Sequence, residues 1–279
     1  MKKIKFGILV PNFNGVTFIE NTLSQLKKGF PGLEILVVDD ASTDNSLEVL
    51  STLNLTILSR KKNGGYAAAV NTGLKYFQSK KYNYVLVANI DIKLKKIDCS
   101  KIFNSLHNFM TKPKVGVLGF VENNFDIKFN EDIPGFLFVL NLQILNEIGY
   151  LDESFHIYGE EQDFFIRAQK ANFSIIQTGI HISHIGESQS IRIRNSWLAI
   201  RNSIYLEIKN YSILKVLRKF FVLLLIINRL YKPVNIDYSL ERVRRPGILI
   251  GNVLLVAACI WNIFNYAFIL VSNVKSKFR

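Results

Sequence analysis

Acidic side chains are concentrated in two short stretches whose spacing could support chemistry. Asp91 ends an apolar run, Tyr84–Ile92, and five acidic residues fall within the twelve positions from Asp152 to Asp163. Carboxylates at that density repel one another, so a cation or substrate that uses them is a natural explanation. A solvated helix start, whose acids are favoured by the helix dipole, is the alternative.

The run that ends at Asp91 predicts a buried strand. Its residues are mostly apolar or aromatic, and its carboxyl end delivers Asn89 and Asp91 to one edge of a sheet. In an open α/β sheet, ligands bind at that edge. A carboxylate that only caps the following loop remains the simpler alternative for Asp91.

Two earlier strands also end in polar, turn-forming residues. Asn12 and Asn14 follow the first, and Asp39 and Asp40 end the second. Acceptors at this edge could receive N–H groups from a nucleobase, and turn or helix capping is the alternative for each Asp. The stretch 63–73, with Gly64 and Gly65, opens a helix whose N–H groups could meet a phosphate. It lacks the Gly-Lys-Ser/Thr ending of a Walker A loop.

Alternating strand and helix patterns position these residues. The pattern predicts an α/β fold with a mostly parallel sheet covered by helices on both faces. Strands are predicted at Ile4–Val10, Glu34–Val38, Leu55–Ser59, Tyr84–Asn89, Val115–Gly119, Gly135–Leu140 and Phe173–Thr178. Helices are predicted at Val16–Lys28, Asp44–Leu53, Gly65–Gln78, Ser100–Met110, Gln143–Ile148 and Glu160–Ala171, and a mobile loop at Glu122–Asp132.

The charge of the chain is unevenly distributed. Of its 279 residues, 49% are hydrophobic, and the last 89 carry 15 basic and three acidic residues, nearly the whole net charge of +13. The predicted domains are 1–210, which contains the sheet, and 211–279, a basic and apolar helical tail. The two cysteines give no disulfide framework or metal-ligand spacing. The first apolar run is too short for a signal peptide, so we expect the N-terminal region to stay in the cytoplasm.

The tail predicts contact with a membrane. Ile213–Leu230 mixes basic and apolar residues, as a helix at a membrane surface does. Ile248–Val271 has 24 residues without a charge, long enough to span a bilayer. A buried core helix or dimer helix is the alternative for this second segment.

Five stretches, in order and at matching spacings, make residues 4–205 resemble the family-2 glycosyltransferases with the GT-A fold. They are Pro11–Gly15, Val37–Asp44, Asn63–Gly73, Asn89–Asp91 and Gly149–Arg167. The resemblance implies that Asp40 contacts the base of a nucleotide-sugar donor. It also places Pro11, Asn14, Asp39, Asn71 and Asn89 in the nucleotide-binding region.

The same resemblance implies a metal site and a catalytic base. Asn89-Ile90-Asp91 is similar to an Asp-x-Asp motif that keeps its last carboxylate, so Asp91 would bind Mg²⁺ or Mn²⁺, with His184 as a second ligand. Glu161 stands where the base of the acceptor-side motif is found, with Glu160 beside it. Asp163, Trp197 and Arg201 fall on the acceptor side. Asn-x-Asp variants of the family include rhamnosyl- and galactofuranosyl-type enzymes.

Together these observations predict an inverting glycosyltransferase. It would move sugar from a nucleotide-diphospho donor to a lipid-linked or polysaccharide acceptor of a cell-surface glycan, such as O-antigen or capsule, at the cytoplasmic face of the membrane. An inactive or regulatory homologue is the alternative, because Asn89 and Glu161 depart from the usual carboxylates. A nucleic-acid binder is disfavoured, because the acids at 152–163 would repel phosphate.

Overall fold

The computed structural model describes residues 4–112, 114–122, 135–185, 193–211, 213–228 and 248–277. The chain forms two compact units. The first comprises residues 1–156 and 160–187, and the second comprises residues 157–159 and 188–279. The predicted loop at 122–132 lies, beyond its first residue, outside the described residues.

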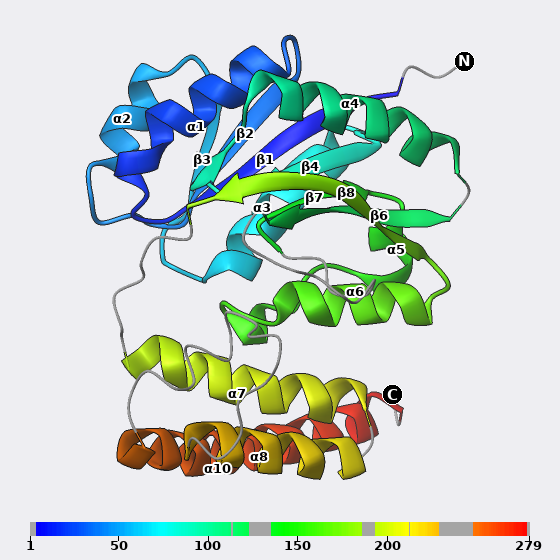
Figure 1. Cartoon of the computed structure of the whole chain (residues 1–279). Helices are drawn as coiled ribbons and strands as arrows, with labels where there is room; N and C mark the ends of the chain where they lie inside the picture. The colour runs from blue at the N-terminus through cyan, green and yellow to red at the C-terminus, as the bar shows by residue number, and fades with distance from the viewer. Residues whose placement is uncertain are drawn as a thin grey trace. The chain divides into compact units, whose positions relative to one another are not determined.

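An eight-stranded sheet forms the centre of the first unit, in the order β3-β2-β1-β4-β7-β6-β8-β5 (Figure 1). Its strands are β1 (Phe6–Asn12), β2 (Glu34–Asp39), β3 (Thr56–Ser59), β4 (Tyr84–Ala88), β5 (Ile92–Lys93), β6 (Val115–Glu122), β7 (Leu137–Asn141) and β8 (Ser174–His184). The four strands β3, β2, β1 and β4 are parallel. The chain leaves β1 towards β2 on one side and returns to β4 on the other, so a topological switch point lies at their carboxyl ends.

Helices cover both faces of this sheet (Figure 1). The helices are α1 (Val16–Gly29), α2 (Ser46–Thr52), α3 (Tyr66–Ser79), α4 (Lys96–Thr111), α5 (Ile144–Ile148) and α6 (Glu160–Lys170), with a short 3-10 turn, η1, at Glu153–Phe155. Apolar residues of α1, α2 and α4 pack on one face, and those of α3, α5 and α6 pack on the other. The predicted α/β class is therefore confirmed.

The second half of the sheet is mixed. Strand β7 runs antiparallel to both β4 and β6, although β6 and β8 are parallel. Strand β8 extends beyond the predicted end at Thr178 to His184, because its last residues pair with β5, where Ile92 lies opposite His184. This pairing brings the end of β8 to the residue that follows Asp91.

Three helices dominate the second unit: α7 (Ile193–Asn210), α8 (Ile213–Ile227) and α10 (Ile248–Lys277). They share one apolar cluster, in which Ile200 of α7, Leu223 of α8 and Leu255 of α10 are buried. Helix α7 thus packs with the tail, so the compact units divide near residue 187, whereas the sequence placed the boundary at 210. Within the described part of the chain, no helix is both long and apolar enough to cross a bilayer.

Candidate functional site

A carboxylate and an imidazole meet beyond the carboxyl end of β4. Asp91 Oδ1 lies 3.0 Å from Nε2 of His184, and the two side chains are 22% and 17% exposed. The backbone N–H of Ile185 donates to the Asp91 carbonyl oxygen at 3.0 Å, which continues the β5–β8 pairing. Asp91 and His184 are 93 positions apart in the sequence and were predicted to share a metal site, and the structure brings their side chains into contact.

Phe136 contacts both His184 and Asn89. The Phe136 ring stacks on His184, with ring centroids 5.0 Å apart. The Phe136 carbonyl accepts a hydrogen bond from Asn89 N–H at 2.9 Å. The Oδ1 atom of Asn89 is buried and has no hydrogen-bond partner among the described residues. A buried carbonyl oxygen without a donor is suited to a cation or a hydrated ligand.

These residues fit a divalent cation that is also bound by substrate. Asp91 and His184 would supply one oxygen and one nitrogen, and Asn89 Oδ1, two residues before Asp91 in the chain, is a buried oxygen without a described partner. Within the described ranges, no group of three or more His, Cys, Asp or Glu side chains is placed to hold a metal. Mg²⁺ often binds through one or two carboxylates plus substrate phosphates, an arrangement that this donor set would suit.

Glu160 and Glu161 begin α6, and both carboxyl groups are held in an environment that favours protonation. Burial, with the neighbouring Glu161 charge, raises the pKa of Glu160 well above its ordinary value. Burial raises the pKa of Glu161 to about 7. One oxygen of Glu160 is buried without a described partner. A carboxyl group with a pKa close to neutrality is matched to general base catalysis at physiological pH.

Gly135 and Tyr66 connect the acidic pair to the Asp91–His184 pair. The Glu161 carboxyl group packs so closely on Gly135 that a Cβ atom there would overlap it. Tyr66 donates its hydroxyl to the Gly135 carbonyl at 3.0 Å. Burial raises the pKa of Tyr66 well above 10, and the charges of Glu161, Glu160 and Asp91 add to that effect. Adjacent residues, 135 and 136, thus join the two halves of the site.

The first polar loops are tied to one another. Asp39 accepts from Asn12 Nδ2 at 2.8 Å and from Ser42 N–H at 3.0 Å. Asn14 Oδ1 accepts from Thr43 N–H at 2.7 Å. The sequence predicts acceptors that face a crevice, but in the structure these side chains hold the loops after β1 and β2 together. Pro11 is buried at the end of β1.

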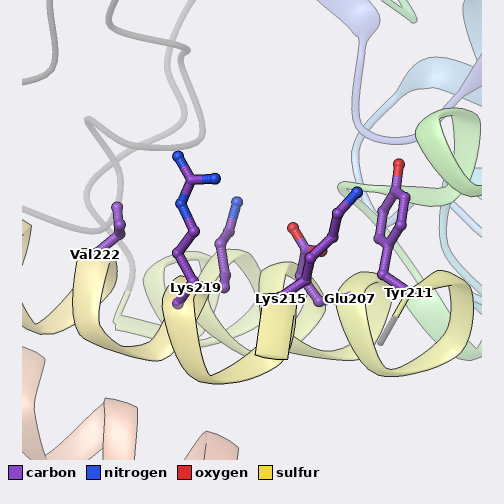
Figure 2. Close-up of a pocket in the computed structure, with 6 residues that line it drawn as sticks. Glu207, Tyr211, Lys215, Lys219 and Val222 are labelled. Atoms are coloured by element: carbon purple, nitrogen blue, oxygen red, sulfur yellow. The ribbon is translucent and has the colours of Figure 1, made fainter. Parts of the chain in front are cut away.

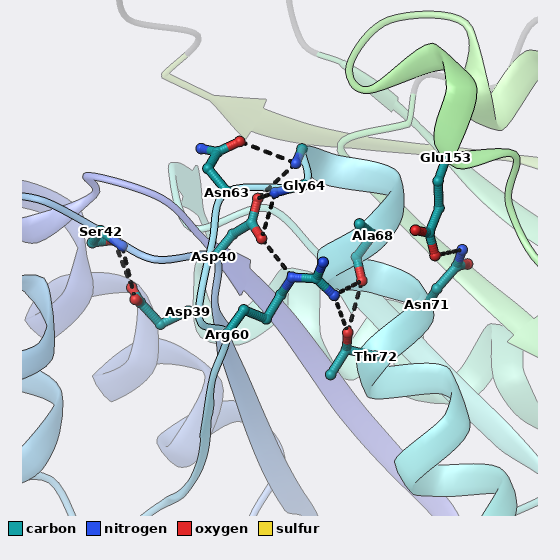
Figure 3. A network of polar contacts seen from close by, with 11 residues as sticks. Asp39, Asp40, Ser42, Arg60, Asn63, Gly64, Ala68, Asn71, Thr72 and Glu153 are labelled. Carbon is teal, nitrogen blue, oxygen red and sulfur yellow. Dashed lines mark hydrogen bonds and ion pairs between the residues drawn. The ribbon is translucent and has the colours of Figure 1, made fainter.

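Asp40 is engaged in the same way (Figure 3). Its carboxylate is buried and accepts from Arg60 Nε at 2.6 Å, and from the N–H groups of Gly64 and Gly65. Arg60 also donates to the Ala68 carbonyl at 2.9 Å. Gly65 has a φ of +86° and faces the His156 backbone, so a side chain would not fit there. Asp40 therefore fixes Arg60 and the start of α3, and its contact with a base stays a prediction.

Two further predicted residues are used to hold loops. Asn71 Nδ2 donates to the Leu151 carbonyl, and its Oδ1 accepts from Leu151 N–H at 3.0 Å. Asp163 is buried and pairs with Arg167 at 2.8 Å, and Arg167 also donates to the carbonyl of Tyr150. These contacts anchor the loop that precedes α6. The predicted nucleotide-binding and acceptor-side roles of Asn71 and Asp163 stay predictions.

Trp197 and Arg201 lie on α7, in the second unit. The Arg201 guanidinium stands 4.4 Å from the ring centroid of Trp261 and 5.2 Å from that of Trp197. Asn202 accepts from Arg201 Nε at 2.6 Å and donates to the Ile157 carbonyl. Arg201 is buried, so its position is explained by packing between α7 and α10, and its acceptor-side role stays a prediction.

Sequence reasoning missed three residues of the site: Arg60, Tyr66 and Phe136. Arg60 directly follows β3, which is a position at the carboxyl edge and could have been considered. Tyr66 comes immediately after the Gly-Gly pair. Its role depends on a hydrogen bond to Gly135, 69 residues away, which the local sequence does not indicate. Phe136 carries no sequence signal, because an aromatic residue before a strand is ordinary.

The sheet order and the helices on both of its faces define an α/β fold of the GT-A type. The chain belongs to glycosyl transferase family 2, whose profile matches residues 7–158. Among solved structures, the mannosyltransferase PcManGT from Pyrobaculum calidifontis, solved with GDP-Man and Mn²⁺, has a TM-score of 0.61 at 14% identity. That match covers 100% of this chain and 82% of the other. TarS of S. aureus with UDP-GlcNAc has a TM-score of 0.54 at 22% identity, over 81% and 72%.

Two sequence relatives extend the comparison. The low-salt glycan biosynthesis hexosyltransferase Agl10 from Haloferax volcanii is 24% identical over 199 residues, in a match that covers 61% of this chain. The poly(ribitol-phosphate) beta-N-acetylglucosaminyltransferase TarS from Staphylococcus aureus is 33% identical over 101 residues, 33% of this chain. The matched regions span 64% of Agl10 and 17% of TarS.

Proposed function

We propose that this protein is an inverting glycosyltransferase. It transfers a hexose from a nucleotide-diphospho-sugar to a lipid-linked or polysaccharide acceptor during synthesis of a cell-surface glycan. One observation carries this proposal, the chain of contacts from Glu161 to Asp91. Glu161, whose pKa is raised to about 7, packs on Gly135. Phe136, the residue after Gly135, stacks on His184, and His184 pairs with Asp91. A base candidate and a cation-binding pair thus share one sheet edge.

The donor half of the site would be held by Asp91 and His184. With Mg²⁺ or Mn²⁺ bound, the ion supplies positive charge that stabilises the departing diphosphate. Asn89 Oδ1, which is buried without a described partner, would accept a hydrogen bond from the donor or from water. The solved PcManGT complex holds Mn²⁺ with its GDP-sugar, which supports the choice of cation. Arg60 and the N–H groups that open α3 border the nucleotide end, where Asp40 holds them in position.

The acceptor half depends on Glu161. With a pKa of about 7, its carboxyl group is about half ionised at neutral pH and can take the proton of an acceptor hydroxyl as that oxygen attacks the anomeric carbon. Attack from the side opposite the leaving diphosphate in a single step inverts the configuration. Glu160 keeps its proton at higher pH than usual, so the pair does not carry two full negative charges at neutral pH.

The acceptor class is proposed from relatives. Agl10 is named for glycan biosynthesis, and TuaG of Bacillus subtilis, 30% identical over 96 residues, for teichuronic acid biosynthesis. Glycans of this kind, which include O-antigen and capsule, are commonly assembled on lipid carriers. We therefore place the reaction at the cytoplasmic face of the membrane, where the basic tail would meet anionic lipid.

A donor panel tests this function. Full-length protein is incubated with UDP-, dTDP- and GDP-sugars, Mn²⁺ and a lipid-linked acceptor extract, and thermal shifts with UDP, dTDP and GDP are measured in parallel. We expect one nucleotide to raise the melting temperature only when Mn²⁺ is present, and its sugar to be transferred. Asp91→Asn should abolish both effects, whereas the exposed control Glu147→Gln should retain them. Nucleotide binding without any turnover would instead indicate an inactive homologue.

A further inference from the structure

An outward-facing apolar stripe runs along α8. Leu214, Leu217, Phe221 and Leu225 are 74%, 49%, 59% and 40% exposed. Their spacing of three or four residues places them on one side of the helix. The residues that bury α8, among them Leu223 and Ile227, occupy the opposite side. Helix α8 is therefore apolar on the face that its own unit does not cover.

Helix α10 repeats this arrangement. Leu249, Val253, Val256, Ile260 and Ile263 are each at least half exposed and follow one another at intervals of three or four residues. Leu255, Ala258 and Asn262 form its buried side. Most of the exposed large apolar residues of the described chain lie on these two helices. Large exposed apolar patches on soluble monomers usually mark surfaces that bind a partner or a membrane.

Cations border the α8 stripe on one flank. A pocket of about 330 Å³ is lined by Glu207, Tyr211, Lys215, Arg218, Lys219 and Val222. Figure 2 shows Tyr211, Lys215 and Lys219 directed to the same side. The Lys215 ammonium stands 3.8 Å from the Tyr211 ring centroid. Neither α8 nor α10 contains an acidic residue. This flank is suited to the phosphate of a lipid headgroup.

We propose that the exposed faces of α8 and α10 bind an anionic phospholipid bilayer, with both helices lying in the plane of the interface. The apolar stripes enter the boundary between headgroups and acyl chains, while Lys215, Arg218 and Lys219 meet lipid phosphates. Amphipathic helices with a basic flank bind membranes in this way. This inference rests on the proposed function, for which it names the membrane partner. Lipid binding can nevertheless be measured without any sugar transfer.

A second copy of the chain fits this face less well. Two copies of a face that carries three cations on α8 and no acid on either helix would bring like charges together. An anionic bilayer supplies the opposite charge as well as apolar volume. Apolar residues lie on both the buried and the exposed side of α8. The sequence could therefore indicate a membrane-surface helix there, but it could not show which apolar residues face outward.

Vesicle sedimentation with a matched pair of variants tests the apolar part. Full-length protein is mixed with vesicles of equimolar phosphatidylglycerol and phosphatidylcholine, or of phosphatidylcholine alone. Phe221→Glu is compared with Phe103→Glu, because Phe221 and Phe103 are 59% and 60% exposed on helices of different units. We expect Phe221→Glu to lower the partition coefficient at least tenfold and Phe103→Glu to leave it unchanged. Equal losses in both variants would overturn the proposal.

The charged flank is tested in the same assay. Lys215→Ala with Arg218→Ala should lower binding to the anionic vesicles by about fivefold for each cation removed, and added salt should reduce binding of the unmodified protein. Binding that is equal on neutral and anionic vesicles would overturn the headgroup contact. A concentration-dependent dimer that Phe221→Glu makes monomeric, without vesicle binding, would assign the face to a second copy. Retained Mn²⁺-dependent nucleotide shifts show that the variants are folded, which separates failure here from failure of the proposed function.

Discussion

Replacing Glu161 with Gln should remove activity and yet stabilise the protein at alkaline pH. The variant keeps the size of the side chain and cannot take a proton from an acceptor. Loss of a general base lowers kcat by about 10²–10⁴-fold. Wild-type kcat/KM should rise with pH through about 7, the pKa that burial gives Glu161. In the variant this rise should be absent.

The stability effect follows from the direction of the same pKa shift. Because burial raises the pKa of Glu161 from 4.5 to about 7, the folded protein holds this proton more tightly than the unfolded chain does. The contribution of Glu161 to the free energy of unfolding is therefore most favourable below about pH 4.5, and it is lost as pH rises through about 7. The difference corresponds to about 3 kcal/mol. Part of the gain in the variant would come from Glu160, which then ionises without a charged neighbour.

Urea unfolding at pH 4 and pH 8, together with a pH–rate profile, measures both effects. We expect Glu161→Gln to match the wild type in free energy of unfolding at the lower pH and to exceed it at the higher pH. The control Glu147→Gln should show neither effect. A variant that keeps its turnover, or that gains no stability between the two pH values, would refute the assignment of Glu161 as a general base with a raised pKa.

Two further substitutions examine how the site is held together. Gly135→Ala should displace the Glu161 carboxyl group and lower kcat by about 10²-fold with little change in nucleotide binding, and an unchanged kcat would contradict the contact. Arg60→Ala leaves Asp40 buried without its ion-pair partner and should cost about 3 kcal/mol in urea unfolding. Adding Asp40→Asn should recover part of that loss, and strictly additive losses would argue against the pair.

The strand positions could be predicted because their apolar runs are short and bounded by turn residues. The direction of β7 could not, since a strand buried on both faces looks the same whether its neighbours are parallel or antiparallel. The end of β8 was also hidden. Residues 179–184 continue the strand because Val121 and Glu122 of β6, and Ile92 and Lys93 of β5, pair with its last residues.

The site was predictable where a residue's role follows from its place at a strand end. Asp91 was identified as a candidate in this way, whereas His184 and Glu161 were candidates because of the family resemblance, and the structure connects all three through Gly135 and Phe136. Asp39 and Asp40 show where such reasoning stops, because a free carboxylate and one bound by a neighbouring loop have the same local sequence. Only the long-range contacts to Asn12 and Arg60 distinguish the two cases.

The adjacency of Gly135 and Phe136 has a consequence for exchanging parts between relatives. One dipeptide leads into β7 and touches Glu161 on one side and His184 on the other. A chimaera joined between β7 and α6 would therefore take Asp91 and this dipeptide from one parent and both Glu161 and His184 from the other. A junction after residue 187 keeps Asp91, Glu161 and His184 in one parent, although it separates residues 157–159 from the rest of the second unit. Transplanting the helical unit should thus redirect where the protein acts without altering what it transfers.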